Sequence, residues 1–255
     1  MPDDIQAMVA DLTRRGTLSP TTVRYAYSVL RIALGRAEKM GRVTYNAATK
    51  IDPPSKATRE MHPLSVDEAR TFLGSLEGDR FAALYVVAIA TGLRQGELLA
   101  LRWSDIDLEA GTLTVSHTLQ RGTRTLAEPK TARSRRSIVL PAMARDALLE
   151  HRRGQRVARI DGLVFATSAG TALDTRKVTR AFQARLAVIG LPRQRFHDLR
   201  HAFATMQIEA GEDIAVVSRI LGHSNLSTTA DVYAHLTPVM QRRSADRMDR
   251  LLASG

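Results

Sequence analysis

The stretch FHDLRH at residues 196–201 decides how the rest of this 255-residue chain is interpreted. Residues three and four positions apart lie on one face of an α-helix, so His197, Arg200 and His201 can point the same way. Two imidazoles and a permanently charged, fork-shaped guanidinium form a cradle for an oxyanion, and phosphate suits it best. Because apolar residues alternate with these polar ones, we expect the helix to hold the polar group rigidly at the edge of a core.

The composition points to a polyanionic partner. The formal net charge is +11, and a protein this basic usually binds nucleic acid, although a general basic bias is an alternative. The chain has no cysteine, which excludes disulfides, thiolate nucleophiles and cysteine zinc sites and fits a reducing cytoplasm. Its 44% hydrophobic residues are enough for a small domain plus a larger one.

No membrane association is expected. The longest apolar run, at residues 81–90, is half the length that a bilayer-spanning helix needs. The N-terminal segment MPDD is acidic where a secretory signal is basic. We therefore expect a soluble intracellular protein in the cytoplasm, associated with the nucleoid.

The N-terminal region predicts two amphipathic helices. Residues 5–15 carry one apolar stripe, and a second helix is capped by Ser19 and ends at Gly41. Arg24 and Arg31 lie on the polar face of the second helix. This face is either a solvated surface or a contact to DNA.

A linker divides the chain into two folded parts. Residues 51–63 lack periodicity and contain prolines, so we place a helical module at 1–50 and a larger domain at 64–255. The larger domain changes from helical patterns to strand character at residues 112–140 and then returns to helices. The predicted fold class is mainly α with a small antiparallel β element (α+β).

The second domain contains a basic segment. Between residues 121 and 136, six basic residues stand against one acid, Glu128, and a basic hairpin suits contact with the DNA backbone. The expected contacts are Arg121, Arg124, Arg133, Arg135 and Arg136. Lys130, taken alone, is simply one of the solvated cations. Earlier in the chain, Arg94 and Glu97 are either a buried charged pair or a surface pair at a helix start, which is the simpler interpretation.

Six polar residues could together support phosphoryl transfer: Arg94, Lys130, His197, Arg200, His223 and Tyr233. Two arginines can hold both non-bridging oxygens of a phosphodiester and neutralise the charge of the pentacoordinate state. A tyrosine can attack phosphorus and form an ester that preserves the energy of the broken bond, so resealing needs neither ATP nor a metal. The leaving hydroxyl needs a proton, which a lysine or a histidine could donate.

A metal site is the main rival interpretation. His197 and His201 at helical spacing, together with His223, could bind zinc. However, Asp198 replaces the general-base glutamate of the zinc-protease pattern, and the intervening arginine would repel a cation. The Asp-x-Asp pair at 105–107 could mark a magnesium-dependent nuclease, but its setting indicates a turn into a strand. We expect no metal and no cofactor.

Five short stretches carry a family resemblance. They are TGLRQGEL at residues 91–98, PKT at 129–131, HDLRH at 197–201, LGH at 221–223 and YAH at 233–235. In this order, they closely resemble the motifs of the tyrosine recombinase family, the phage-type integrases. The resemblance implies a site-specific DNA recombinase, as found in mobile elements, that cleaves and rejoins double-stranded DNA through a 3′-phosphotyrosyl intermediate.

The family pattern assigns a role to each polar residue. Arg94 and Arg200 would bind the scissile phosphate. Lys130 would protonate the leaving 5′ oxygen, and Tyr233 would be the nucleophile.

The pattern also implies roles around these four residues. His197 and His223 would hydrogen-bond the phosphate or assist proton transfer. Glu97 would brace the first arginine, and His201 would have a packing or supporting role.

The chain departs from the family pattern at its N-terminus. Family members usually carry a longer helical core-binding module, of which residues 1–50 match only the latter half. The resemblance implies a homo-tetramer on DNA, with accessory DNA-bending or directionality proteins as further partners. We expect a monomer in free solution, because a half-module supplies little oligomer surface and the net charge disfavours self-association.

Two alternative functions stay open. One is a type IB topoisomerase-like nicking-closing enzyme, which would relax supercoils without a defined site. The other is a recombinase relic that binds DNA without cutting it.

Overall fold

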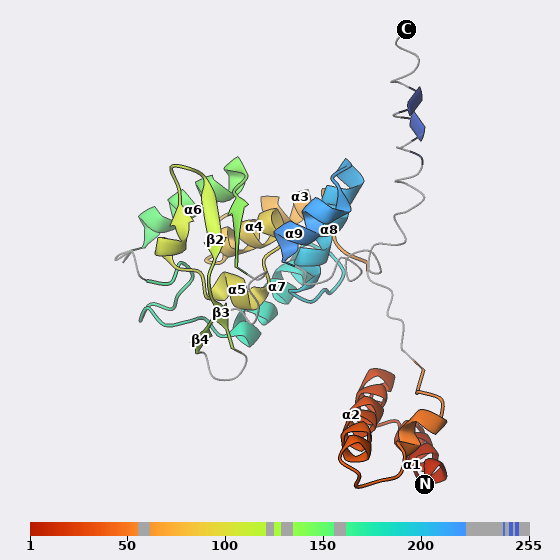
Figure 1. Ribbon diagram of the computed structural model, residues 1–255. Helices are drawn as coiled ribbons and strands as arrows, with labels where there is room; N and C mark the ends of the chain where they lie inside the picture. Colours follow the sequence, from red (N-terminus) through yellow and green to blue (C-terminus); the bar gives the residue numbers. More distant parts are fainter. Residues whose placement is uncertain are drawn as a thin grey trace. The chain divides into compact units, whose positions relative to one another are not determined.

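The structure is a computed structural model that describes residues 1–55, 62–120, 125–128, 135–155, 162–222, 242, 245–246 and 248–249. The chain divides into two compact units, Met1–His62 and Pro63–Gly255, called unit 1 and unit 2 and described separately. Figure 1 labels their helices and some of the strands. Within the described ranges, no helix combines the length and the apolar character needed to cross a membrane.

Unit 1 contains two helices and a short turn. They are α1 (Pro2–Arg14), α2 (Pro20–Lys39) and the 3-10 turn η1 (Ala47–Lys50). The Ser19 hydroxyl accepts a hydrogen bond from the Thr22 N–H and so caps the first turn of α2.

The core of unit 1 is small. Its buried residues are Ile5, Val9, Val23, Tyr27 and Ala48. The Tyr27 hydroxyl donates a hydrogen bond to the Ala48 carbonyl at 2.7 Å, and the Asn46 amide donates to the Arg31 carbonyl at 2.8 Å. These two bonds fasten the segment around η1 to α2.

Unit 2 is built mainly from helices. They are α3 (Val66–Gly74), α4 (Ala82–Thr91), α5 (Gln95–Leu99), α6 (Ala142–Gly154), α7 (Thr175–Val188), α8 (Asp198–Ala210) and α9 (Ile214–Leu221). Helix α4 packs on α3, α6 and α8 and is apolar on nearly every side, as expected of a fully enclosed helix. Edge-to-face rings link α3, α4, α7 and the segment before α8. They are Phe72, Tyr85, Phe182 and Phe196.

The strands of unit 2 form two small antiparallel sheets. The first has the order β1-β2-β5, and the second pairs β3 with β4. Their bounds are β1 (Ile106–Asp107), β2 (Thr112–Val115), β3 (Thr118–Leu119), β4 (Leu126–Ala127) and β5 (Arg136–Val139). Buried Leu113 lies opposite buried Ile138. The predicted fold class, mainly α with a small antiparallel β element, is confirmed.

Within the region of predicted strand character, residues 112–119 form two strands rather than one. The first, β2, belongs to the three-stranded sheet, whereas β3 pairs with β4. At the break, the Ser116 hydroxyl bonds to the Asp105 carboxylate and to the His117 ring. These side-chain bonds hold the chain where it changes sheets.

Candidate functional site

The first turn of α8 is fixed by a charged pair. The Asp198 carboxylate accepts a hydrogen bond from the Arg195 N–H and pairs with the Arg195 guanidinium at 2.7 Å. Leu199 is buried on the inner face of the helix. These contacts fix the directions in which His197 and Arg200 leave the chain.

Arg200 reaches from α8 to the ends of two other helices. The residue is 3% exposed. Its Nη1 donates to the Gly92 carbonyl at 2.9 Å and its Nη2 to the Leu221 carbonyl at 2.8 Å. Because the planar guanidinium is bound on two sides by neutral carbonyls, it keeps both its orientation and its charge.

Gly92 makes this approach possible. It ends α4 in the left-handed conformation with a φ of 62°. A Cβ at this position would lie 2.6 Å from Phe203 and 2.7 Å from Leu221. Glycine therefore satisfies both the backbone conformation and the close packing.

Arg94 lies at the start of α5 and pairs with Glu97 one turn later. Its N–H donates to Glu97 Oε2 at 2.9 Å and its Nη1 to Oε1 at 2.8 Å. Its Nη2 donates to the Gly222 carbonyl at 3.2 Å. The Glu97 side chain is 5% exposed and that of Arg94 is 39% exposed. The pair is thus a buried brace that leaves one edge of the Arg94 guanidinium open, rather than a surface pair.

Glu97 is ionised despite its burial. Burial opposes ionisation, but the hydrogen bonds and charges of Arg136 and Arg94 outweigh it and hold the pKa of Glu97 below its ordinary value. The Arg136 Nη2 lies 2.9 Å from Glu97 Oε2. The Glu97 carboxylate is therefore shared by two guanidiniums. Together with Arg200, these residues form the arginine cluster (Arg94, Glu97, Arg136 and Arg200), which retains a surplus of positive charge.

Two histidines lie beside Arg200. The rings of His197 and His201 are perpendicular, with centroids 5.0 Å apart. Loss of solvent around the ring, followed by the charges of His201 and Arg200, lowers the pKa of His197 to about 4. Burial also lowers the pKa of His201. Both imidazoles are therefore neutral at pH 7 and can donate one hydrogen bond each.

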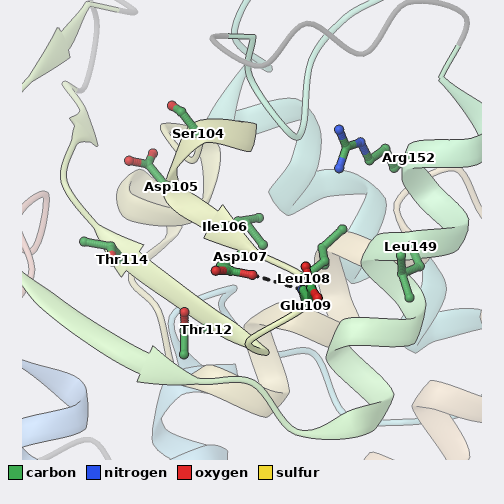
Figure 2. A pocket seen from close by; sticks show the side chains of 10 residues that line it. All are labelled: Ser104, Asp105, Ile106, Asp107, Leu108, Glu109, Thr112, Thr114, Leu149 and Arg152. Carbon is green, nitrogen blue, oxygen red and sulfur yellow. Dashed lines mark hydrogen bonds between the residues drawn. The ribbon is translucent and has the colours of Figure 1, made fainter.

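The acidic pair considered as a magnesium site holds turns instead. Asp105 accepts a hydrogen bond from the Arg102 N–H at 3.0 Å. Asp107 accepts from the N–H groups of Glu109 and Ala110 at 3.0 and 2.8 Å. Both carboxylates line a pocket of about 610 Å³ between β1, β2 and α6 (Figure 2). In the part of the chain that the structure describes, no three His, Asp or Glu side chains are grouped to hold a metal ion.

Comparison with known proteins identifies the family of this chain. The model of the phage integrase family matches residues 64–239, which include the whole arginine cluster. The chain belongs to the phage integrase family.

Two curated relatives of this integrase-family protein match most of its length. A tyrosine recombinase XerC-like protein of Caldanaerobacter subterraneus subsp. tengcongensis is 33% identical over 261 residues, which cover 91% of this chain and 67% of the relative. An integrase of Streptomyces ambofaciens is 32% identical over 247 residues, which cover 88% of this chain and 63% of the relative. The chain thus spans about two thirds of the length of these relatives.

Solved integrases share the fold. The Tn1549 transposon integrase in complex with a circular intermediate DNA has a TM-score of 0.84 and 24% identity, covering 97% of this chain and 85% of that one. A lambda integrase tetramer bound to a Holliday junction has a TM-score of 0.64 and 21% identity, covering 88% of this chain and 64% of that one.

The structure brings together five of the residues expected in the integrase site. Arg94, Glu97 and Arg200 meet near the end of α9, and His197 and His201 lie beside Arg200. Three further expected site residues lie outside the described residues: Lys130, His223 and Tyr233.

The arginines expected to contact DNA differ in their settings. Arg31 is exposed on α2, whereas Arg24 is half-buried and donates to a backbone carbonyl. The Arg135 side chain is 61% exposed, but that of Arg136 is only 7% exposed, because it is turned inward to Glu97. Three more lie outside the described residues: Arg121, Arg124 and Arg133.

Helix α7 offers a basic surface that the expected set does not include. Exposed Arg176 and Arg180, together with Arg193, line a groove of about 950 Å³. The signal was present in the sequence, since Asp174 caps this helix and two arginines four residues apart lie on one face.

Proposed function

We propose that the chain is a site-specific DNA recombinase that cleaves and rejoins double-stranded DNA through a 3′-phosphotyrosyl intermediate, without metal or ATP. One observation carries this proposal: in a phage integrase family chain, Arg94 and Arg200 donate to the successive carbonyls of Gly222 and Leu221, directly before His223. Two guanidiniums held at one helix end can bind both non-bridging oxygens of a phosphodiester.

In the proposed reaction, Tyr233 is the nucleophile. Its phenolic oxygen passes its proton to His223 and bonds to phosphorus. The bond from phosphorus to the 5′ oxygen breaks, and the 3′ phosphate stays on the protein. Lys130 gives the departing 5′ oxygen its proton. Arg94 and Arg200 stabilise the charge of the pentacoordinate state, and neutral His197 donates a hydrogen bond to a phosphate oxygen. Attack of a 5′ hydroxyl on the phosphotyrosine reverses these steps and reseals the strand.

We extend the proposal to partners and domains. The Tn1549 and lambda structures hold DNA, the latter as a tetramer on a Holliday junction, and we infer that this chain is a monomer when free and a homo-tetramer on DNA. Residues 1–50 would act as a partial DNA-binding module, 51–63 as a linker and 64–255 as the catalytic domain. The site of action would be the nucleoid, with accessory DNA-bending or directionality proteins as further partners.

Covalent capture tests the proposal. The protein is incubated with nicked duplexes of random sequence, in which cleavage near the nick releases a short oligonucleotide and so prevents rejoining. We expect an adduct on denaturing gels, unchanged by excess EDTA, and its sequenced DNA defines the target site. Tyr233→Phe should bind the captured DNA without forming the adduct.

Three outcomes would count against the proposal. An adduct formed by the phenylalanine variant would exclude Tyr233 as the nucleophile. Absence of an adduct with every sequence would indicate a relic that only binds DNA. Relaxation of plasmids that lack the captured site would indicate a topoisomerase.

A further inference from the structure

Arg136, the first residue of β5, belongs to the arginine cluster. It was expected to contact DNA as part of the basic segment at residues 121–136, but its side chain points inward. Its Nη1 lies 3.3 Å from Glu97 Oε1 and its Nη2 lies 2.9 Å from Oε2. Glu97 uses the same two oxygens for Arg94. The contact spans 39 residues of sequence and therefore ties the three-stranded sheet to α5.

Three successive carbonyls at the end of α9 accept hydrogen bonds from three different arginines. The pairs are Ile220 with Arg136, Leu221 with Arg200 and Gly222 with Arg94. The last carbonyls of a helix have no partner within the helix and carry partial negative charge, so they are suited to hold cations. The end of α9 therefore sets the positions of the three guanidiniums relative to one another.

Gly222 packs closely against Arg136. Its φ is 66°, and a Cβ built on it would lie 2.9 Å from the Arg136 Nη1. The turn that leads into His223 is therefore shaped around the Arg136 side chain. A shift of that side chain would displace the turn as well as Glu97.

Sharing of Glu97 also sets the charge that Arg94 can offer. If Glu97 paired with Arg94 alone, their charges would cancel and the carboxylate would compete with an incoming phosphate. Because Arg136 makes a two-pronged pair with the same carboxylate, Arg94 is oriented by Glu97 without being neutralised by it.

We propose that Arg136 is a positioning residue for phosphate binding. It holds Glu97, and through it Arg94, together with the turn into His223, and it does not itself touch the phosphate. This inference rests on the proposed function.

The test compares Arg136→Lys with Arg70→Lys. Arg70 lies on α3, outside the proposed site and the expected DNA contacts, and its side chain is 75% exposed. Both changes preserve the charge. Single-turnover cleavage is measured on the captured sequence with a normal scissile phosphodiester and with a methylphosphonate. The methylphosphonate has a methyl group in place of one non-bridging oxygen and is uncharged. Displacement of Arg94 should therefore lower the cleavage rate less on the methylphosphonate than on the phosphodiester.

We expect Arg136→Lys to slow phosphodiester cleavage roughly 10- to 100-fold and methylphosphonate cleavage by about threefold or less. Arg70→Lys should change either rate by about twofold or less. A role confined to folding would make Arg136→Lys slow both substrates equally. Equal slowing, or no slowing, would overturn the inference.

A second measurement does not depend on DNA cleavage. Inorganic phosphate is titrated into ¹⁵N-labelled protein while the Arg94 Nε–H signal, assigned with Arg94→Lys, is followed by NMR. We expect Arg136→Lys to weaken phosphate binding by about fivefold or more, and Arg70→Lys to leave it nearly unchanged. Equal affinities would overturn the inference.

These two measurements separate the inference from the proposed function. If the wild-type protein captures no DNA, the proposed function fails, and the phosphate titration alone decides the role of Arg136. Arg136→Gln, which keeps one donor for Glu97, is titrated in parallel and replaces the lysine variant if that variant does not fold.

Discussion

Arg200, which binds the end of α9, and the arginines on α7 are the same residue type with opposite exposure to solvent. Arg200 is enclosed and donates to two carbonyls, whereas Arg176 and Arg180 are exposed beside a groove. The enclosed arginine has its geometry before any ligand arrives, as transition-state stabilisation requires. The side chains of the exposed arginines can adjust to the phosphates of a DNA backbone. Such contacts are sufficient for affinity. We therefore propose that burial separates the arginines that perform chemistry from those that attach the protein to DNA.

Replacing Arg200 with lysine should have the largest effect. A lysine ammonium cannot bind the carbonyls of Gly92 and Leu221 as a fork, so we expect single-turnover cleavage to fall roughly 10²- to 10³-fold. DNA affinity, measured by filter binding, should change by about threefold or less. Arg176→Lys is the matched exposed control and should keep the wild-type rate. Equal losses of cleavage rate in the two variants would contradict the distinction between enclosed and exposed arginines.

Lys130→Ala tests whether a cation of the basic segment performs chemistry. If Lys130 is the general acid, cleavage should slow by roughly 10²-fold. A substrate with a 5′-phosphorothiolate should restore the rate, because sulfur leaves without needing a proton. Equal slowing on the oxygen and sulfur substrates would mean that Lys130 binds phosphate instead.

The double change Arg176→Ala and Arg180→Ala tests whether the exposed arginines of α7 bind the DNA backbone. Removing two phosphate contacts should weaken DNA binding about tenfold and reduce the slope of log K against log salt by about two. The cleavage rate at saturating DNA should stay at the wild-type value. An unchanged salt slope, measured by fluorescence anisotropy, would show that α7 does not face the DNA backbone.

The smallest expected effect concerns the pH dependence of stability. The pKa of His197 is about 4 in the folded protein and 6.5 in an ordinary setting, so between these values the unfolded chain binds more protons. Stability is therefore fully present above pH 6.5 and falls as the pH drops toward 4. In the His197→Gln variant, Tm should fall less between pH 6.5 and pH 4 than in the wild type, by roughly 2 to 4 °C. Superimposable curves of Tm against pH for the two proteins would contradict this.

Helix ends could be predicted because their signals are local. Ser19 precedes α2, and Ser65 forms a reciprocal capping box with Glu68 at the start of α3. Gly92 closes α4, and a glycine directly after an apolar run is a signal for a helix end. Each signal depends only on residues within one turn of the chain. The break at Ser116 was not predictable, because its partner Asp105 lies in another element.

The setting of Arg136 shows the limit of sequence reasoning within the site. Arg135 and Arg136 are neighbours in one basic run, and nothing in their composition distinguishes them. Their different burial depends on the strand register, since a shift of one residue exchanges the faces of a strand. That register is set by pairing with β2, and the inward contacts of Arg136 are to Glu97 and Ile220, 39 and 84 residues away. The pair of Arg94 and Glu97 was visible in sequence, but its burial depends on similarly distant packing.

The enclosure of α4 has a consequence for hydrogen exchange. Its peptide groups are shielded on nearly every side by unit 2, so their amide protons should exchange only when the whole unit opens. The Gly92 carbonyl that holds Arg200 lies directly at the end of this helix. This anchor of Arg200 should therefore persist through partial openings that expose less protected segments.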